Sequence, residues 1–237
     1  MGLTISQQRA ARVAGLTFLL AITIIVITNY SVSFRLIVPG NAAETATNIL
    51  ANETLFRLNV VGDLFYLLNL IVMLAALHVV LKPVAEGLSL VAAFGRFVYA
   101  SVWAMIGLNI LDAIRFLGDA AYLSVFTIEQ LQAMALLHLA RGNDLYYIGL
   151  PFWGLASVLI AYLFLKSRYV PRWLSWFGLF ASAWCVFCGF VFLAYPRFDA
   201  IVHPGWFDMP LVVFEVILGF WLLIKGLGSA KATREES

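Results

Sequence analysis

The stretch that decides the fold lies between Arg57 and Pro83 and reads RLNVVGDLFYLLNLIVMLAALHVVLKP. Arg57 opens it, Lys82 and Pro83 close it, and almost every residue between them is apolar. An α-helix needs about 20 apolar residues to cross the hydrocarbon core of a bilayer, and this run is long enough. Because backbone polar groups in lipid must be satisfied within their own segment, the run predicts a transmembrane helix over 58–81.

The composition of the whole chain agrees with this prediction. Of its 237 residues, 63% are hydrophobic and 12% are charged, and the mean hydropathy is +0.94. A soluble domain is about half apolar and a quarter charged, and in water a chain of this length would leave too much apolar surface exposed. The formal charge of +2 gives no electrostatic support for nucleic-acid binding. We therefore predict an integral membrane protein in contact with lipids, with no nucleic-acid partner.

Five further apolar runs are long enough to span a membrane. They cover 13–33, 90–112, 145–165, 173–194 and 209–227. The six runs together predict an all-α, polytopic membrane bundle of about six transmembrane helices. No polar stretch is long enough for a second domain, so residues 1–227 are expected to form one domain. The polar residues 228–237 are expected to form a disordered cytoplasmic tail.

The basic residues predict the orientation, because cytoplasmic loops carry an excess of Lys and Arg. If the N-terminus is cytoplasmic, ten basic residues fall on the inner side and five on the outer side. The inner connection over 166–172 is short and contains three of the ten. Both termini are therefore expected in the cytoplasm. The inner set is Arg9, Arg12, Lys82, Arg96, Lys166, Arg168, Arg172, Lys225, Lys231 and Arg234, and the outer set is Arg35, Arg57, Arg115, Arg141 and Arg197.

Two outer loops have the composition of short helices. Residues 42–56 are rich in helix formers, with Ala46, Ile49 and Phe56 available to pack on a bundle. Residues 127–140 begin with Thr-Ile-Glu-Gln, the Ser/Thr-x-x-Glu/Gln spacing of a capping box. Both loops predict short amphipathic helices at the outer interface. Either they are connectors packed on the bundle, or they cover a site.

Ionisable residues at membrane depth are the informative ones, because each is costly unless it is paired or solvated. In the second span, Asn59, Asp63, Tyr66 and Asn69 follow one another at helical spacing and form one polar stripe. That stripe is expected to face protein or water. Glu215 in the last span is expected to be paired with a cation or protonated.

These residues define a candidate site in the outer half of the membrane. With the orientation above, the acids Asp63, Asp112 and Glu215 fall at similar depth, and Arg57 and Arg115 are near enough to act as counter-charges. We expect a polar, outward-facing chamber that binds a ligand or handles protons. The alternative is a set of interhelical hydrogen bonds and ion pairs that only fixes helix packing. The candidate ligand-binding residues are Arg57, Asp63, Asn69, Asn109, Asp112 and Glu215.

Arg96 lies near the inner end of the third span. A long basic side chain in such a position can extend its guanidinium to the headgroups. We expect Arg96 to do so.

Other site chemistries find little support in the sequence. A metal site built from His138, His203 and Asp208 has no recognisable ligand spacing. Cys185 and Cys188 have the Cys-x-x-Cys spacing but lie in an apolar helix, where they are expected to pack rather than react. No nucleophile–base pair can be named, so no catalytic residue is predicted. No cofactor is indicated, and a bound lipid is the expected non-protein component.

Several stretches resemble one family of bacterial integral membrane proteins. They are Arg12-Val-Ala-Gly15, residues 46–53 (ATNILANE), Leu55-Phe-Arg57, residues 166–172 (KSRYVPR), Glu215 and residues 221–226 (WLLIKG). In this combination the chain resembles the family known as domain of unknown function 4386, over nearly its whole length. The resemblance implies a six-helix bacterial protein of the cytoplasmic membrane. It implies no activity, cofactor or catalytic residue.

Three functions remain open from the sequence. The first is binding or transport of a small molecule or lipid through the polar chamber. The second is an accessory, non-catalytic subunit of a larger membrane complex, because a chain with few protruding parts and many aromatic, lipid-facing residues is suited to lateral packing. The third is a membrane-embedded enzyme that modifies a lipid, which has the least support because no reactive pair is present.

Overall fold

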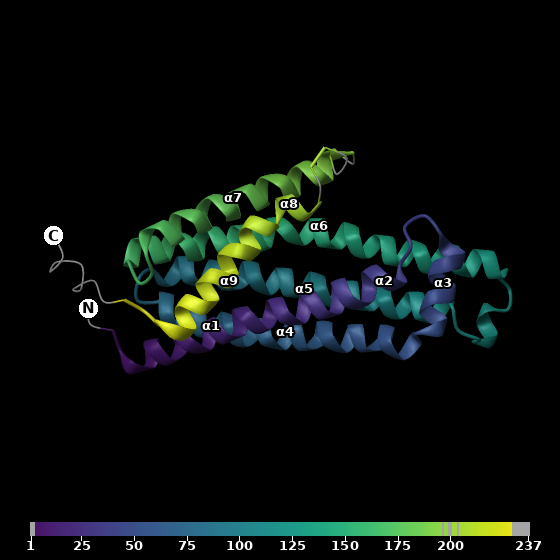
Figure 1. The fold of residues 1–237 in the computed structure, drawn as a ribbon, viewed down its shortest axis with the longest axis horizontal. Coiled ribbons are helices and arrows are strands. Elements are labelled where there is room, and N and C mark those ends of the chain that lie inside the picture. The colour runs from purple at the N-terminus through teal and green to yellow at the C-terminus, as the bar shows by residue number, and fades with distance from the viewer. Residues whose placement is uncertain (1–2, 196, 199–200, 203, 229–237) are drawn as a thin grey trace. The chain divides into compact units, whose positions relative to one another are not determined.

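The computed structural model describes residues 3–195, 197–198, 201–202 and 204–228 (Figure 1). All regular structure within these ranges is helical. The predicted disordered tail falls almost entirely on 229–237, outside the described residues. The elements are α1 (Ile5–Ile25), the π-helix η1 (Val26–Ser33), α2 (Phe34–Leu36), α3 (Ala42–Ala51), α4 (Glu53–Leu81), α5 (Glu86–Phe116), the 3₁₀ turn η2 (Ala121–Leu123), α6 (Ile128–Ser167), α7 (Arg172–Ala194), α8 (Pro204–Phe207) and α9 (Met209–Ile224).

The predicted all-α membrane bundle is confirmed. Five helical segments, Ile5–Leu36, Glu53–Leu81, Glu86–Phe116, Ile128–Ser167 and Arg172–Ala194, are long and apolar enough to cross a membrane. The sixth, α9, is apolar but has only 16 residues, so it is about 24 Å long at 1.5 Å per residue. That is shorter than the hydrocarbon core, which is about 30 Å thick.

The predicted helix over 42–56 divides at Asn52. α3 covers Ala42–Ala51, and the Asn41 side chain caps it by accepting a hydrogen bond from the backbone N–H of Glu44 at 3.1 Å. α4 then begins at Glu53. Ala46, Ile49 and Phe56 are buried as expected.

The prediction of a separate helix over 127–140 was wrong, because these residues form the first part of one 40-residue helix, α6. Its start is as expected: Thr127 and Gln130 exchange a backbone-to-side-chain hydrogen bond in each direction, at 2.9 and 3.3 Å. The polar residues 141–144, between the predicted segments 127–140 and 145–165, are helical as well. None of them is a proline, so the backbone ladder continues through them, and Pro151 lies further along within the helix.

The chain forms two compact units, each described by itself. Unit 1 comprises Met1–Ile22, Leu68–Ala100 and Tyr147–Ser237, and unit 2 comprises Thr23–Leu67 and Ser101–Tyr146. The expectation of a single domain stays a prediction.

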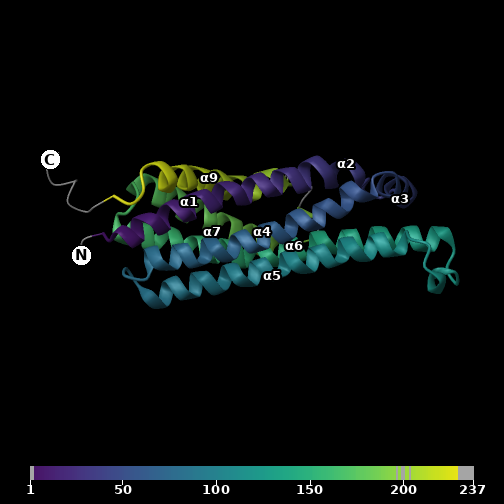
Figure 2. The ribbon, with the colours of Figure 1, turned by 90° about the horizontal axis from the view of Figure 1, so that it is seen from below.

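Small residues let the helices of unit 1 approach closely. A Cβ on Gly15 of α1 would lie 2.6 Å from the carbonyl oxygen of Gly219 on α9, so the two backbones are in contact. Glycines at such crossings are typical of helix packing in membranes. Figure 2 shows α1 beside α9, and the Gln8 side chain exchanges hydrogen bonds with the Leu227 backbone at 2.8 and 3.0 Å. The two ends of the described chain in unit 1 therefore lie together.

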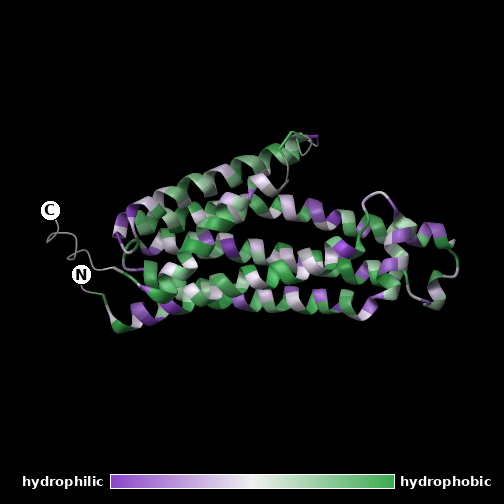
Figure 3. Cartoon of the chain, in the orientation of Figure 1, coloured by the Kyte–Doolittle hydropathy of each residue, from purple (hydrophilic) through white to green (hydrophobic). Residues whose placement is uncertain are grey.

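In unit 1, the surface of α7 that faces away from α9 is apolar and exposed. α7 packs against α9, and Phe177 meets Phe214 edge-on, with ring centroids 6.4 Å apart. Figure 3 shows that hydrophobic residues cover most of α7. Its large aromatic side chains Trp173, Trp176, Phe180, Trp184, Phe187 and Phe190 are exposed.

The core of unit 2 joins α3 to the adjoining parts of the long helices. Ile49 and Phe56 are fully buried against Ala113 and Ile114 of α5. Leu139 of α6 completes the cluster. This packing positions α3 and the start of α4 next to the end of α5.

Candidate functional site

Among the described charged residues of unit 1, the most deeply buried is Arg96 on α5. Its guanidinium donates hydrogen bonds to Oε1 of Glu215 on α9 and, at 3.0 Å, to Oγ of Ser157 on α6. Arg96 is 1% exposed and Glu215 is 5% exposed. The expectation that Arg96 extends to the headgroups was therefore wrong. A carboxylate within direct reach neutralises its charge, so the guanidinium stays inside the protein.

Aromatic and hydroxyl groups complete the surroundings of this pair. The indole N–H of Trp153 and the hydroxyl of Ser157 donate to the same Glu215 oxygen, at 2.8 and 3.2 Å. The guanidinium carbon lies 5.8 Å from the ring centroid of Phe18 and 5.9 Å from that of Trp153, within cation–π range. The Tyr99 ring stacks on the Trp153 ring, with the two ring centroids 5.6 Å apart. The cluster ties α5, α6 and α9 together, which is the packing role left open by the sequence.

The predicted counter-charges of Glu215 lie elsewhere. Arg57 pairs with Glu53 one turn away, at 2.7 Å, and Arg115 pairs with Asp112 at 3.0 Å. The second pair joins residues three apart on one helix, a spacing that favours an ion pair. The first was missed, although Glu53 and Arg57 have the i, i+4 spacing that favours an ion pair on a helix.

The two predicted asparagines donate to main-chain carbonyls. Asn69 on α4 donates to the carbonyl of Thr17 on α1 at 2.8 Å and so connects two helices of unit 1. Asn109 donates to the carbonyl of Met105 on its own helix in unit 2, at 2.9 Å. Their amide N–H groups are thus used in backbone hydrogen bonds.

The six predicted site residues are divided between the units. Asn69 and Glu215 belong to unit 1, and Arg57, Asp63, Asn109 and Asp112 belong to unit 2. Asp112 has a second neighbour in His138, whose Nδ1 lies 3.5 Å from its Oδ2. His203, considered as a metal ligand with His138 and Asp208, lies outside the described residues.

Asp63 and Asn59 form a second buried polar group, in unit 2. They are 2% and 1% exposed, which agrees with the predicted inward-facing stripe. The Asn59 amide N–H donates to Oγ of Ser33 at 2.8 Å. Neither carboxylate oxygen of Asp63, nor Oδ1 of Asn59, has a hydrogen-bond partner among the described residues.

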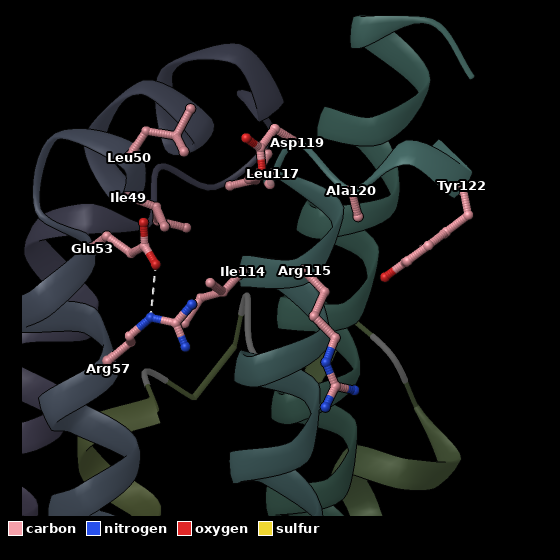
Figure 4. A pocket seen from close by; sticks show the side chains of 11 residues that line it. Ile49, Leu50, Glu53, Arg57, Ile114, Arg115, Leu117, Asp119, Ala120 and Tyr122 are labelled. Carbon is pink, nitrogen blue, oxygen red and sulfur yellow. Dashed lines mark hydrogen bonds and ion pairs between the residues drawn. The ribbon is translucent and has the colours of Figure 1, made fainter. Parts of the chain in front are cut away.

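A cleft of about 260 Å³ is present in unit 2. α3 and α4 form one wall, and the end of α5 with the following turn forms the other. Figure 4 shows Arg57 and Glu53 joined on one wall, with the Arg57 guanidinium reaching toward Ile114. The lining residues are Ile49, Leu50, Glu53, Arg57, Ile114, Arg115, Leu117, Gly118, Asp119, Ala120 and Tyr122. The cleft thus combines apolar walls with two guanidinium groups and two carboxyl groups.

Residues 13–226 match the family model described as a domain of unknown function, DUF4386. The chain belongs to this family. An uncharacterised protein of the archaeon Archaeoglobus fulgidus is 27% identical to it over 169 residues, which is 71% of this chain and 83% of that relative. No solved structure matches the chain significantly. The expected family is thereby confirmed, and the match covers both units.

Proposed function

We propose that this DUF4386 protein binds a small amphiphile, of the class of membrane lipids, with its polar headgroup in the cleft of unit 2. The observation that carries the proposal is the lining of that cleft, where Arg57 and Arg115 stand with Glu53 and Asp119 among apolar side chains. Ligand sites in proteins are mostly apolar with a few placed polar groups. A volume of about 260 Å³ suits a headgroup rather than a whole lipid.

The charges of the lining favour a zwitterionic headgroup. Two arginines and two acids give the lining no net formal charge, so it can pair with a phosphate and an ammonium group at once. The side chains of Arg57 and Arg115 are 54% and 65% exposed, and each uses one guanidinium nitrogen in its ion pair with Glu53 or Asp112. Arginine has five N–H donors, so both retain donors for a phosphate.

The same proposal includes transport of the bound molecule. It also includes a location in a bacterial cytoplasmic membrane, with both termini inside and this cleft outside. Ten basic residues against five support the orientation. The contact between Gln8 and Leu227 supports a common side for the two ends.

The experiment compares lipid-induced thermal stabilisation of the full chain in detergent. Phosphatidylethanolamine is expected to raise the melting temperature of the wild type, and diacylglycerol, which has no charged headgroup, to raise it less. Arg57→Gln with Arg115→Gln should abolish the difference. Arg35→Gln is the matched control, because Arg35 is exposed, belongs to unit 2 and does not line the cleft. Equal shifts for both lipids, or an unchanged shift in the double variant, would overturn the proposal.

A second candidate function is an accessory subunit of a larger membrane complex. The exposed aromatic face of α7 favours it, because such a face requires a cover of lipid or protein. Gentle, lipid-retaining extraction from the native host followed by native mass spectrometry tests it. Recovery of the protein free of other chains would exclude this candidate.

A further inference from the structure

The Asp63 group of unit 2 presents oxygen acceptors with no donor. Both carboxylate oxygens of Asp63 and Oδ1 of Asn59 are buried and unpartnered within the described part of the chain. Asn59 and Asp63 are four residues apart on α4, so their side chains lie on one face, about 6 Å apart along the axis. Buried polar atoms are nearly always hydrogen-bonded, so three such acceptors together require an explanation.

These acceptors belong to the face of α4 that adjoins the π-helix η1. Asn59 donates to Ser33 of η1, and a Cβ on Gly62 would collide with Cγ2 of Thr28, so the Thr28 side chain packs directly on α4 at Gly62. π-helical turns are rare and occur frequently at functional sites. The Thr28 hydroxyl already donates to the carbonyl of Ile24 at 3.0 Å. It is therefore committed to its own helix.

The chemistry of the group selects the ligand class. A carboxylate and an amide carbonyl are hard oxygen donors, which suit alkali and alkaline-earth cations rather than transition metals. The group has one negative charge when Asp63 is ionised, and no set of three His, Cys, Asp or Glu side chains suited to a metal occurs among the described residues. One charge balances one monovalent cation, and burying the carboxylate without a cation would be costly.

We propose that Asp63 and Asn59 bind a monovalent cation of the Na⁺ class in unit 2. The carboxylate neutralises the ion, and the Asn59 carbonyl and the adjacent Ser33 hydroxyl oxygen supply neutral ligands. Neither Asp63 nor Asn59 lines the amphiphile cleft, so this site is independent of the proposed function.

The test measures binding of ²²Na⁺ to the full chain in detergent and the melting temperature in NaCl and in N-methyl-glucamine chloride at equal ionic strength. The wild type should bind Na⁺ saturably and melt higher in NaCl. Asp63→Asn keeps the shape of the side chain and removes its charge, so Na⁺ affinity should fall at least tenfold. Asp112→Asn is the matched control and should retain wild-type affinity, since the Asp112 carboxylate is half-buried and already paired with Arg115.

Two results would overturn the proposal. One is the absence of saturable ²²Na⁺ binding to the wild type. In that case Asp63 would be a protonated carboxyl group that binds no cation. The other is unchanged binding in Asp63→Asn. If that variant does not fold, Asn59→Ala, which removes the neutral ligand, must still weaken Na⁺ binding to the folded protein.

Discussion

Arg96 and Glu215 are 119 positions apart in the sequence and form one buried ion pair between α5 and α9 of unit 1. Trp153 and Ser157 of α6 hold the same carboxylate, so a single oxygen accepts from three side chains. This relationship connects three helices of unit 1 through one buried carboxylate.

Removal of one member of this pair should destabilise the protein more than removal of both. Arg96→Met and Glu215→Leu, made singly, each leave a buried charge without its partner, which costs about 3–5 kcal/mol. The double variant replaces the pair with apolar side chains and should recover much of that loss. Thermal unfolding in detergent measures the three variants. A double variant that is less stable than either single one would contradict this account.

Alanine should have opposite effects at two glycines. At Gly15 the new Cβ would lie 2.5 Å from the backbone nitrogen of Leu223, so α1 and α9 must separate, at a cost of roughly 1–3 kcal/mol. At Gly87, near the start of α5, no atom lies within 4 Å of the new Cβ, and alanine favours the helix by about 0.5–1 kcal/mol. Melting temperatures of the two variants should move in opposite directions. Shifts of the melting temperature in the same direction for both variants would mean that Gly15 does not lie at a helix crossing.

The Thr127 cap should stabilise the start of α6. Thr127→Ala removes the acceptor for the Gln130 N–H and should cost about 1 kcal/mol. Thr47→Ala is the control, since the exposed Thr47 hydroxyl only donates back to the Ala43 carbonyl within α3. Hydrogen exchange at residues 128–131 should rise in the first variant alone. Unchanged exchange there would show that packing, not the cap, holds this end.

Thiol labelling should test the proposed orientation. Cys185 and Cys188 are fully buried, so a membrane-impermeant maleimide should react only with an introduced cysteine. In intact cells Ser124→Cys, beyond the end of α5, should be labelled, and Lys82→Cys, between α4 and α5, should be labelled only after lysis. The reverse pattern would place the termini outside.

Much of the fold follows from the sequence because the bilayer imposes simple requirements on a chain. Length and hydropathy predicted the spanning helices, and the spacing of Asn59 and Asp63 predicted a buried face. The spacing of the capping residues Thr127 and Gln130 predicts the start of α6 without reference to any tertiary contact. Each of these depends on residues close together in the chain.

The candidate site depended on partners that local patterns do not reveal. Helical periodicity gives the face and approximate depth of Arg96, but not the rotation of α9 that brings Glu215 to it. A charge six residues inside a predicted span was a signal that a partner should be sought. The cleft likewise depends on how α3 packs against the end of α5.

The sequence by itself determined that the fold is an all-α bundle, that its long helices are apolar enough to cross a membrane, and that Asp63 and Glu215 must be buried or paired. Tertiary structure alone decided that Glu215 is paired with Arg96, while the carboxylate oxygens of Asp63 have no hydrogen-bond partner in the part of the chain that the structure describes. The physical reason is that hydropathy acts on each segment separately, whereas the pairing of buried charges depends on the contacts between segments.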